Sequence, residues 1–166
     1  MIASVKKLQV IDSSILAEYI LANIGKASHL KIQKLLYYVQ GYHLAYFDAP
    51  IIEDDFQAWA HGPVSKKLFN SLKDKSILHT DLVYKEKEDI ESILTRIAEY
   101  LSEDQMSLIN EVLKTLWGFS WIELEEYTHA EAPWISARVG YALGDKCEVV
   151  ISKESMKAFF KTQIYA

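Results

Sequence analysis

Three side chains in this sequence have the chemistry of a hydrolytic site. His61, His129 and Glu131 supply two imidazoles and a carboxylate, the groups that most often transfer protons in enzymes. A hydrolase or nuclease built from them requires the fold to bring them together, because they are separated along the chain. The alternative is that both histidines, which lie beside a turn and a helix start, are hydrogen-bonded structural groups. Convergence of the three side chains on an open pocket would distinguish the two interpretations.

The signatures of nucleotide and metal sites are incomplete in this chain. The segment Gly25 to Ser28 lacks the leading glycine and the adjacent Lys-Ser pair of a phosphate-binding loop. His129-Ala130-Glu131 shares two residues with the zinc deaminase motif, but that chemistry needs a cysteine pair and Cys147 is the only cysteine. No glycine-framed serine marks a nucleophile elbow. We therefore predict a protein that is not an enzyme, with no catalytic residue, no cofactor and no metal.

Composition and charge limit the class of protein. The 166 residues are half apolar and one quarter charged, which is typical of one soluble globular domain spanning residues 1–166. A net charge of −5 argues against sequence-independent binding of nucleic acid. Residues 1–10 lack the apolar core of a signal peptide, and no apolar run is long enough to span a bilayer. These features predict a cytoplasmic protein with no membrane partner and no nucleic-acid partner.

The element that must position these residues is a long aromatic helix. Its expected inward stripe recurs at three- and four-residue steps and consists of Ile32, Leu35, Leu36, Val39, His43, Tyr46 and Phe47. Ser28 is the expected N-cap, because its side chain can accept a bond from the first turn. The helix is expected to end near Asp48, since Pro50 disfavours helical geometry at Ala49.

A short strand and a turn should follow this helix. Residues 56–60 alternate in the manner of a strand, and His61-Gly62-Pro63 then forms a turn. Pro63 suits the first position of a further helix, expected over residues 63–72. Residues 147–151 form another strand candidate, which could pair with residues 56–60. We therefore predict a mainly α (α+β) fold, a compact single-domain helical fold with a small two- or three-stranded β element.

The first helix gives a second functional alternative. It should open at residues 12–14 and stop at Gly25, after an inward stripe of Ile15, Leu16, Tyr19, Ile20 and Ile24. The short link to the aromatic helix predicts an antiparallel pair, which also superficially fits a helix-turn-helix-like DNA-binding regulator. Lys31 and Lys34 would lie on the recognition helix, but the tyrosines that follow them argue against reading of DNA.

Capping patterns predict the starts of the remaining helices. Three segments read as capping boxes: residues 102–105, 120–123 and 128–131. The third should open a short helix that carries Trp134 and Arg138. Ser152 should cap a last helix, whose inward residues are Met156, Phe159 and Phe160.

Three ordered motifs resemble the signatures of the SocA-like antitoxin family, the Panacea domain. The first runs from Lys31 to His43, the second from Phe56 to Val64 and the third from Thr128 to Gly140. Val39 stands where the first motif usually has alanine, and Ala60 stands where a polar or basic residue is usual. The family-motif positions, for which we expect a structural role, are Gln33, Leu35, Tyr38, Trp59, His61, Gly62, Pro63, His129, Glu131, Pro133, Trp134 and Arg138.

The resemblance implies an antitoxin of a bacterial or phage toxin-antitoxin system. Such a protein neutralises a co-encoded toxin by direct protein–protein binding. Delivery of the toxin to a protease, or a chaperone as a further partner, is another mode that the resemblance leaves open. It implies no catalytic residues and does not identify the toxin or its target.

Two structural expectations concern the aromatic residues. Trp59 and Trp134 should lie near each other and fix the helix packing, because one core must accommodate both aromatic-rich turns. Tyr37, Tyr38 and Tyr42 flank the inward stripe, and a buried tyrosine needs a partner for its hydroxyl. At least one of the three is therefore expected to be substantially exposed and to bind the partner. The acidic residues 53–55 could steer a basic toxin.

Overall fold

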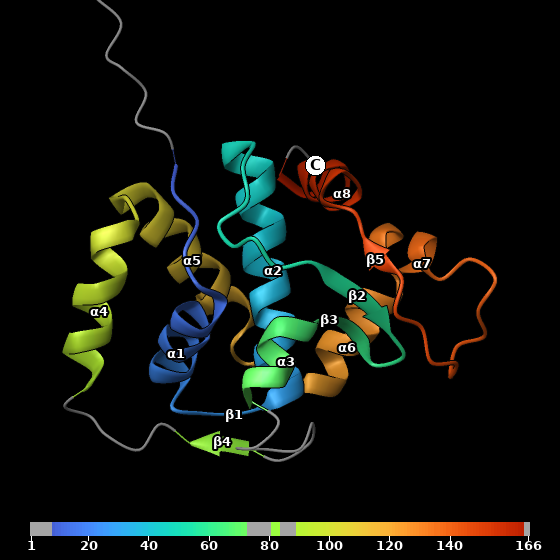
Figure 1. Ribbon diagram of the computed structural model, residues 1–166, viewed down its shortest axis with the longest axis horizontal. Helices are drawn as coiled ribbons and strands as arrows, with labels where there is room; N and C mark the ends of the chain where they lie inside the picture. Colours follow the sequence, from blue (N-terminus) through green and yellow to red (C-terminus); the bar gives the residue numbers. More distant parts are fainter. Residues whose placement is uncertain (1–7, 73–80, 84–88, 165–166) are drawn as a thin grey trace, which may run out of the picture.

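The computed structural model describes residues 8–72, 81–83 and 89–164 and arranges most of them as helices around a central one (Figure 1). The central helix is α2 (His29–Phe47). Four helices contact it: α1 (Ser13–Ile24), α5 (Glu103–Leu116), α6 (Trp121–His129) and α8 (Lys153–Ile164). The other helices are α3 (Lys66–Leu72), α4 (Asp89–Tyr100) and α7 (Ala132–Ala137). The predicted mainly helical fold is confirmed.

Two small antiparallel sheets accompany the helices. The larger has the strand order β3-β2-β5, with β2 (Phe56–Trp59) between β3 (Gly62–Ser65) and β5 (Val150–Ile151). Phe56 lies opposite Ile151, which confirms the predicted pairing of these two segments. A second sheet pairs β1 (Lys26–Ser28) with β4 (Asp81–Val83), and the sequence did not predict it.

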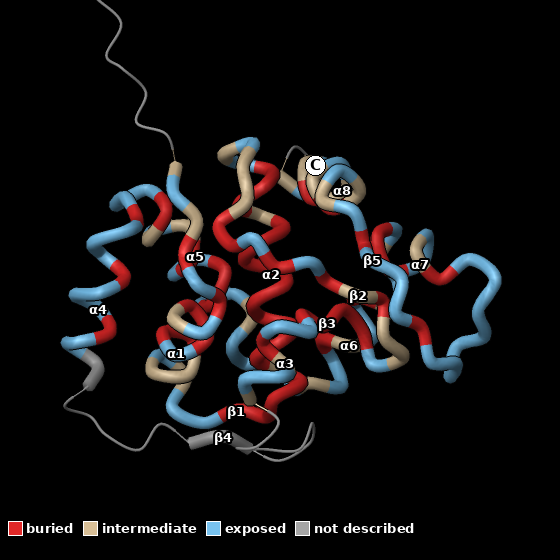
Figure 2. The backbone as a smooth tube through the Cα atoms, viewed as in Figure 1, coloured by how far each residue is buried: buried red, intermediate tan, exposed pale blue. Residues whose placement is uncertain are grey.

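The predicted bounds of α2 are confirmed. The Ser28 side chain accepts a bond from the Lys31 amide, and the helix ends at Asp48, which adopts the left-handed conformation. Helix α2 is buried along most of its length (Figure 2). The expected inward stripe is buried from Ile32 to His43, whereas Phe47 is half-buried. Tyr46 was wrongly placed inward: its side chain is 57% exposed.

The predicted helix over residues 63–72 is wrong in its first turn. Residues 62–65 form β3, and α3 begins only at Lys66 after the Ser65 side chain accepts from the Leu68 amide. Pro63 fits the strand because β3 is an edge and Pro63 faces Ala58, whose amide bonds to Val149 on the other side. The missing N–H of Pro63 therefore removes no bond within the sheet.

The third capping box is also wrong. Helix α6 continues through Thr128 and His129, and the Thr128 hydroxyl bonds back to the Glu125 carbonyl. Helix α7 starts after Glu131, whose side chain makes no capping bond, and Arg138 is its C-cap. The boxes at Ser102 and Ser120 are both confirmed, with reciprocal side-chain and backbone bonds.

The remaining helix ends follow local sequence signals. Asp12 caps α1 and Gly25 ends it, while Ser152 caps α8. Phe160 of α8 packs directly on Gly41 of α2, where an added Cβ would lie 2.1 Å from the phenyl ring. Met156 and Phe160 are buried as predicted, and Phe159 is half-buried.

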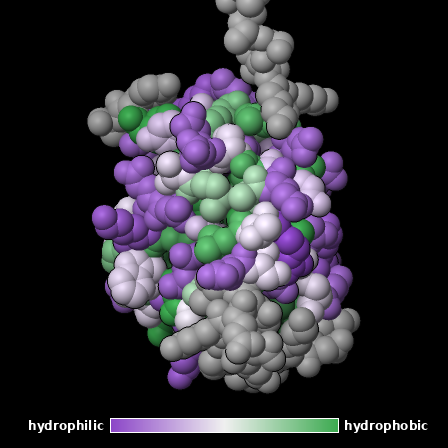
Figure 3. All heavy atoms as spheres, turned by 90° about the vertical axis from the view of Figure 1, so that its left-hand side faces the viewer, coloured by the Kyte–Doolittle hydropathy of each residue, from purple (hydrophilic) through white to green (hydrophobic). Residues whose placement is uncertain are grey.

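The outer face at α4 differs from the core. Hydrophilic side chains surround scattered apolar ones on this side of the molecule (Figure 3). Among the described helices, none combines the length and apolar character needed to cross a membrane.

Candidate functional site

The three signature segments meet around the first half of α2. The Trp134 indole N–H of α7 donates to the Trp59 carbonyl of β2 at 2.8 Å. This bond confirms that Trp59 and Trp134 lie near each other. The Trp134 ring stacks on His129 with centroids 3.9 Å apart, while the Trp59 ring packs edge-on against Phe69. Helix α7 is thus fixed to the β2–β3 turn through the backbone of one tryptophan and the side chain of the other.

The two histidines of the hydrolase alternative lie near one carboxylate, that of Glu125, which sequence analysis did not single out. His61 Nδ1 lies 3.0 Å from Glu125 Oε1, and His129 Nε2 lies 3.7 Å from the same oxygen. Burial lowers the pKa of His129, and the Glu125 charge opposes that shift. Glu131 is bonded elsewhere, because its Oε2 accepts from the Tyr38 hydroxyl at 2.9 Å. The trio expected for a hydrolase or nuclease is therefore divided between two clusters.

Lys34 lies beneath the His-Gly-Pro turn and is fully buried. Its side chain is 0% exposed, and among the described residues its Nζ has no hydrogen-bond partner. Burial lowers the pKa of Lys34 to about 8, although the nearby Glu125 charge acts in the opposite direction. Gly62 has φ +106°, and an added Cβ there would approach Thr128 Oγ1 to 2.9 Å and Lys34 Cε to 3.2 Å. The turn therefore requires glycine for both conformation and space.

Gln33 holds the edge strand β3 in the way that another strand would. Its Oε1 accepts from the Ser65 amide at 2.9 Å, and its Nε2 donates to the Ser65 carbonyl at 3.2 Å. The Gln40 side chain repeats this arrangement one heptad later, bonding the Ile51 and Ile52 amides and the Ile52 carbonyl. Leu35 is in the core. The motif residues of α2 thus satisfy backbone groups and fill the interior.

Arg138 fixes the loop that follows α7. Its Nη1 donates to the Ala58 carbonyl at 2.7 Å, and its Nη2 donates to the carbonyls of Ala142, Leu143 and Asp145. The guanidinium also lies 5.0 Å from the centroid of the Trp134 ring. Pro133 is buried in the first turn of α7. The contacts found for Pro133, Trp134 and Arg138 are structural ones.

The three candidate partner-binding tyrosines differ in burial. Tyr37 and Tyr38 are buried, so neither reaches a partner in this fold, and Tyr42 is half-buried. None of them is substantially exposed, contrary to expectation. Burial raises the pKa of Glu131, which lies among the three hydroxyls, to about 7, and the bond from Tyr38 opposes that rise.

The acidic residues 53–55 do not form the expected free patch. Asp54 is buried and accepts from the Ser65 hydroxyl at 2.5 Å. Asp55 forms an ion pair with Lys153 at 2.9 Å. Asp54 therefore makes an internal contact, whereas the Asp55 carboxylate stays at the surface in an ion pair.

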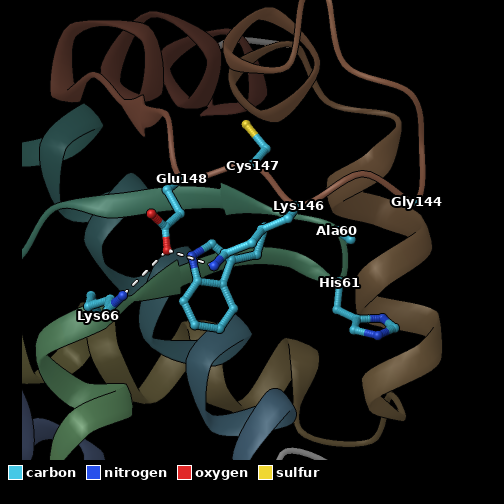
Figure 4. A pocket seen from close by; sticks show the side chains of 8 residues that line it. Ala60, His61, Lys66, Gly144, Lys146, Cys147 and Glu148 are labelled. Carbon is cyan, nitrogen blue, oxygen red and sulfur yellow. Dashed lines mark hydrogen bonds and ion pairs between the residues drawn. The ribbon is translucent and has the colours of Figure 1, made fainter.

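A pocket of about 380 Å³ opens beside the β2–β3 turn (Figure 4). Glu148 at its wall reaches Lys66 at 3.4 Å and Lys146 at 3.8 Å. His61 stands at its edge, but the buried Lys34 and Glu131 do not line it. Among the described residues, no group of three His, Cys, Asp or Glu side chains is placed to hold a metal ion.

The arrangement of α2 is incompatible with the helix-turn-helix alternative. A recognition helix must expose one face to the major groove. Lys34 is buried, Lys31 donates through Nζ to the Trp117 carbonyl, and neighbouring helices cover most of α2 up to its last turns. In this fold the pair of α1 and α2 has no free reading face.

Sequence analysis did not place Lys34 beneath the His-Gly-Pro turn or Glu125 beside His61 and His129. Local signals existed for both. Glu125 precedes His129 by four residues on α6, which places the two on one helix face. Lys34 lies four residues from both Leu30 and Tyr38, which are buried.

Comparison with known proteins gives one finding. Residues 32–135, more than half of the chain, match the family model described as antitoxin SocA-like, Panacea domain. Neither curated proteins nor solved structures gave a match. The matched range contains the first signature motif from Ile32 onward, the whole of the second, and the third as far as Ile135. The chain therefore belongs to the SocA-like antitoxin family and carries a Panacea domain.

Proposed function

We propose that this protein is a cytoplasmic antitoxin that neutralises a co-encoded protein toxin by binding it directly, without catalysis. Residues 1–166 act as one antitoxin domain in this proposal. Family membership supports an antitoxin-like function. The division of the expected hydrolytic trio between two clusters removes the geometric support for the enzyme alternative.

The observation that carries direct binding is the distribution of exposed apolar side chains. Most of the large exposed apolar residues of the described chain lie beyond α5, between residues 117 and 150: Trp117, Ile122, Tyr127, Ile135, Val139, Tyr141, Leu143, Val149 and Val150. Aromatic and aliphatic side chains supply most of the binding energy in protein interfaces. Gln33, Leu35 and Tyr38 of the first motif are buried, whereas residues 117–150 offer the larger exposed apolar surface.

Co-expression with the product of the neighbouring reading frame tests this proposal. We expect the antitoxin to restore growth to cells that express that product, and the two purified proteins to co-elute as a complex. The amount of toxin should remain constant during rescue, because binding alone neutralises it. Loss of the toxin with time would instead indicate delivery to a protease, and absence of both rescue and complex would contradict the antitoxin proposal.

A further inference from the structure

A groove of about 200 Å³ runs between α2 and α5. Tyr42 and Tyr46 form its α2 side, and five residues form its α5 side: Leu108, Glu111, Val112, Thr115 and Leu116. Its inner wall includes Val112, which is buried, and Tyr46 stands at its open edge. Leu116 belongs to the last turn of α5.

The polar groups on the α5 side of this groove can accept hydrogen bonds, and one of them is negatively charged. Glu111 carries an exposed carboxylate, and the Thr115 hydroxyl donates to the Glu111 carbonyl, which leaves its own oxygen as an acceptor. Tyr42 and Tyr46 add two aromatic rings one helical turn apart. Among the lining residues none is basic. Burial raises the pKa of the Tyr42 hydroxyl, and the nearby Glu131 adds to that shift.

We propose that this groove receives an arginine side chain of the toxin, with apolar residues of the toxin on either side. The inference rests on the proposed antitoxin function for the source of the arginine. A guanidinium is planar, stacks on tyrosine rings and pairs with a carboxylate through two parallel bonds. An acidic side chain would be repelled by Glu111, and an aliphatic one would leave that carboxylate without a counter-ion.

The arginines of this chain already have partners. This protein has two arginines, Arg96 and Arg138. Arg138 is buried and bonded to four backbone carbonyls, and Arg96 forms an ion pair with Glu18 at 3.4 Å. The lysines nearest in sequence to Phe160, Lys157 and Lys161, both pair with Asp48 at the end of α2. A second copy of this chain could offer only Arg96, which would have to leave its ion pair with Glu18, so the toxin is the proposed source of the arginine.

The first experiment does not depend on the antitoxin function. N-acetyl-arginine N-methylamide is titrated into the full-length protein and followed by amide chemical shifts, with the citrulline analogue as a neutral control of the same shape. We expect saturable shifts at residues lining the groove for the arginine probe, and at least a fivefold weaker response for citrulline. The Glu111→Gln variant should lose the difference. Equal responses to both probes, or shifts located elsewhere, would overturn the inference.

The second experiment uses the toxin encoded by the neighbouring reading frame. Glu111→Arg and Tyr46→Ala should each weaken the complex at least tenfold and reduce growth rescue, whereas Glu99→Arg on α4 makes the same charge change on another exposed face and should have no effect. Far-UV circular dichroism and Tm should remain unchanged in all three variants. Wild-type rescue with undiminished binding by the groove variants would overturn the groove proposal alone. Failure of wild-type rescue would overturn the proposed function, and the probe titration would then decide the groove.

Discussion

The first and the last turns of α2 differ in which side chains they bury. The first half buries His29, Gln33 and Lys34, while the last turns leave Tyr42 half-buried and Tyr46 exposed. The difference arises from what packs against each half. The β2–β3 turn and α6–α7 cover the first half and supply matching backbone groups, whereas the last turns border an open groove. Gln33 and Trp134 thus make internal hydrogen bonds, whereas Tyr42 and Tyr46 keep side-chain surface accessible.

The largest effect should come from removing the tryptophan that joins α7 to the turn. Trp134→Ala should lower the free energy of unfolding by about 3–5 kcal/mol, because it removes a buried ring, its stacking on His129 and the bond to the Trp59 carbonyl. Trp134→Phe keeps an aromatic ring and should lose about 1–2 kcal/mol for the missing bond. Urea denaturation measures both values. A loss below about 1 kcal/mol for the alanine variant would contradict a central role of Trp134.

The buried lysine should make stability depend on pH. The pKa of Lys34 falls from 10.5 to about 8 in the folded state, so the folded protein binds fewer protons between these values. Burial of the charged Lys34 lowers the free energy of unfolding by on the order of 3 kcal/mol. This destabilisation is complete below pH 8 and declines as the pH rises to 10.5. Lys34→Met should therefore be more stable than wild type at pH 7, with a difference that shrinks towards pH 10. A methionine variant that is less stable at pH 7 would show that the lysine charge is needed.

The glutamine contacts should have a smaller and localised effect. Gln33→Met keeps the side-chain length but leaves the Ser65 amide and carbonyl without their partner, which should cost about 2 kcal/mol. Gln40→Met makes the corresponding change for the Ile51 and Ile52 amides and serves as the matched variant. Hydrogen exchange should accelerate at Ser65 in the first variant and at Ile51 and Ile52 in the second. Uniform acceleration across the protein would contradict a local role.

The smallest effect on stability is expected at the exposed end of α2. Tyr46→Ala should change the free energy of unfolding by less than about 0.5 kcal/mol, because the side chain is largely outside the core. Thermal unfolding, compared with that of a Tyr38→Phe variant that loses the bond to Glu131, checks this expectation. If Tyr46→Ala destabilises the fold as much as Tyr38→Phe does, the two halves of α2 are not different in the way described here.

Local signals predicted most helix bounds, but they did not predict the contacts that surround each element. Ser28 and Pro50 fixed the bounds of α2, and the boxes at Ser102 and Ser120 fixed two helix starts. Pro63 suits both a helix start and an edge strand, and the choice depends on the distant contact between Gln33 and Ser65. Thr128 matches a capping pattern, but it lies inside α6, which begins at Trp121 and ends at His129. A local capping or helix-start pattern therefore mispredicts the structure where a distant residue or a preceding helix already bonds the backbone groups that the pattern would cap.

In the candidate site, too, the sequence indicated the important residues but not their distant contact partners. The motif residues were expected to have a structural role, and the contact partners Glu125 and Ser65 lie far along the chain from His61 and Gln33. The burial of Tyr37 and Tyr38 depends on how many helices surround α2, which hydrophobic periodicity does not reveal. A helix enclosed on nearly every side has no single inward stripe.

Arg138 holds the backbone of its loop in a way that does not depend on most of the loop's side chains. All four of its bonds are to carbonyl oxygens, which every amino acid supplies, and the Asp145 side chain adds one bond to the Ala142 amide. Val139 and Leu143, 79% and 75% exposed, take no part in this framework through their side chains. Their replacement should leave the loop in its present conformation. Arg138 thus fixes the backbone of the loop, while its exposed side chains are free to be substituted. New contact residues can therefore arise at these positions without a change in the fold.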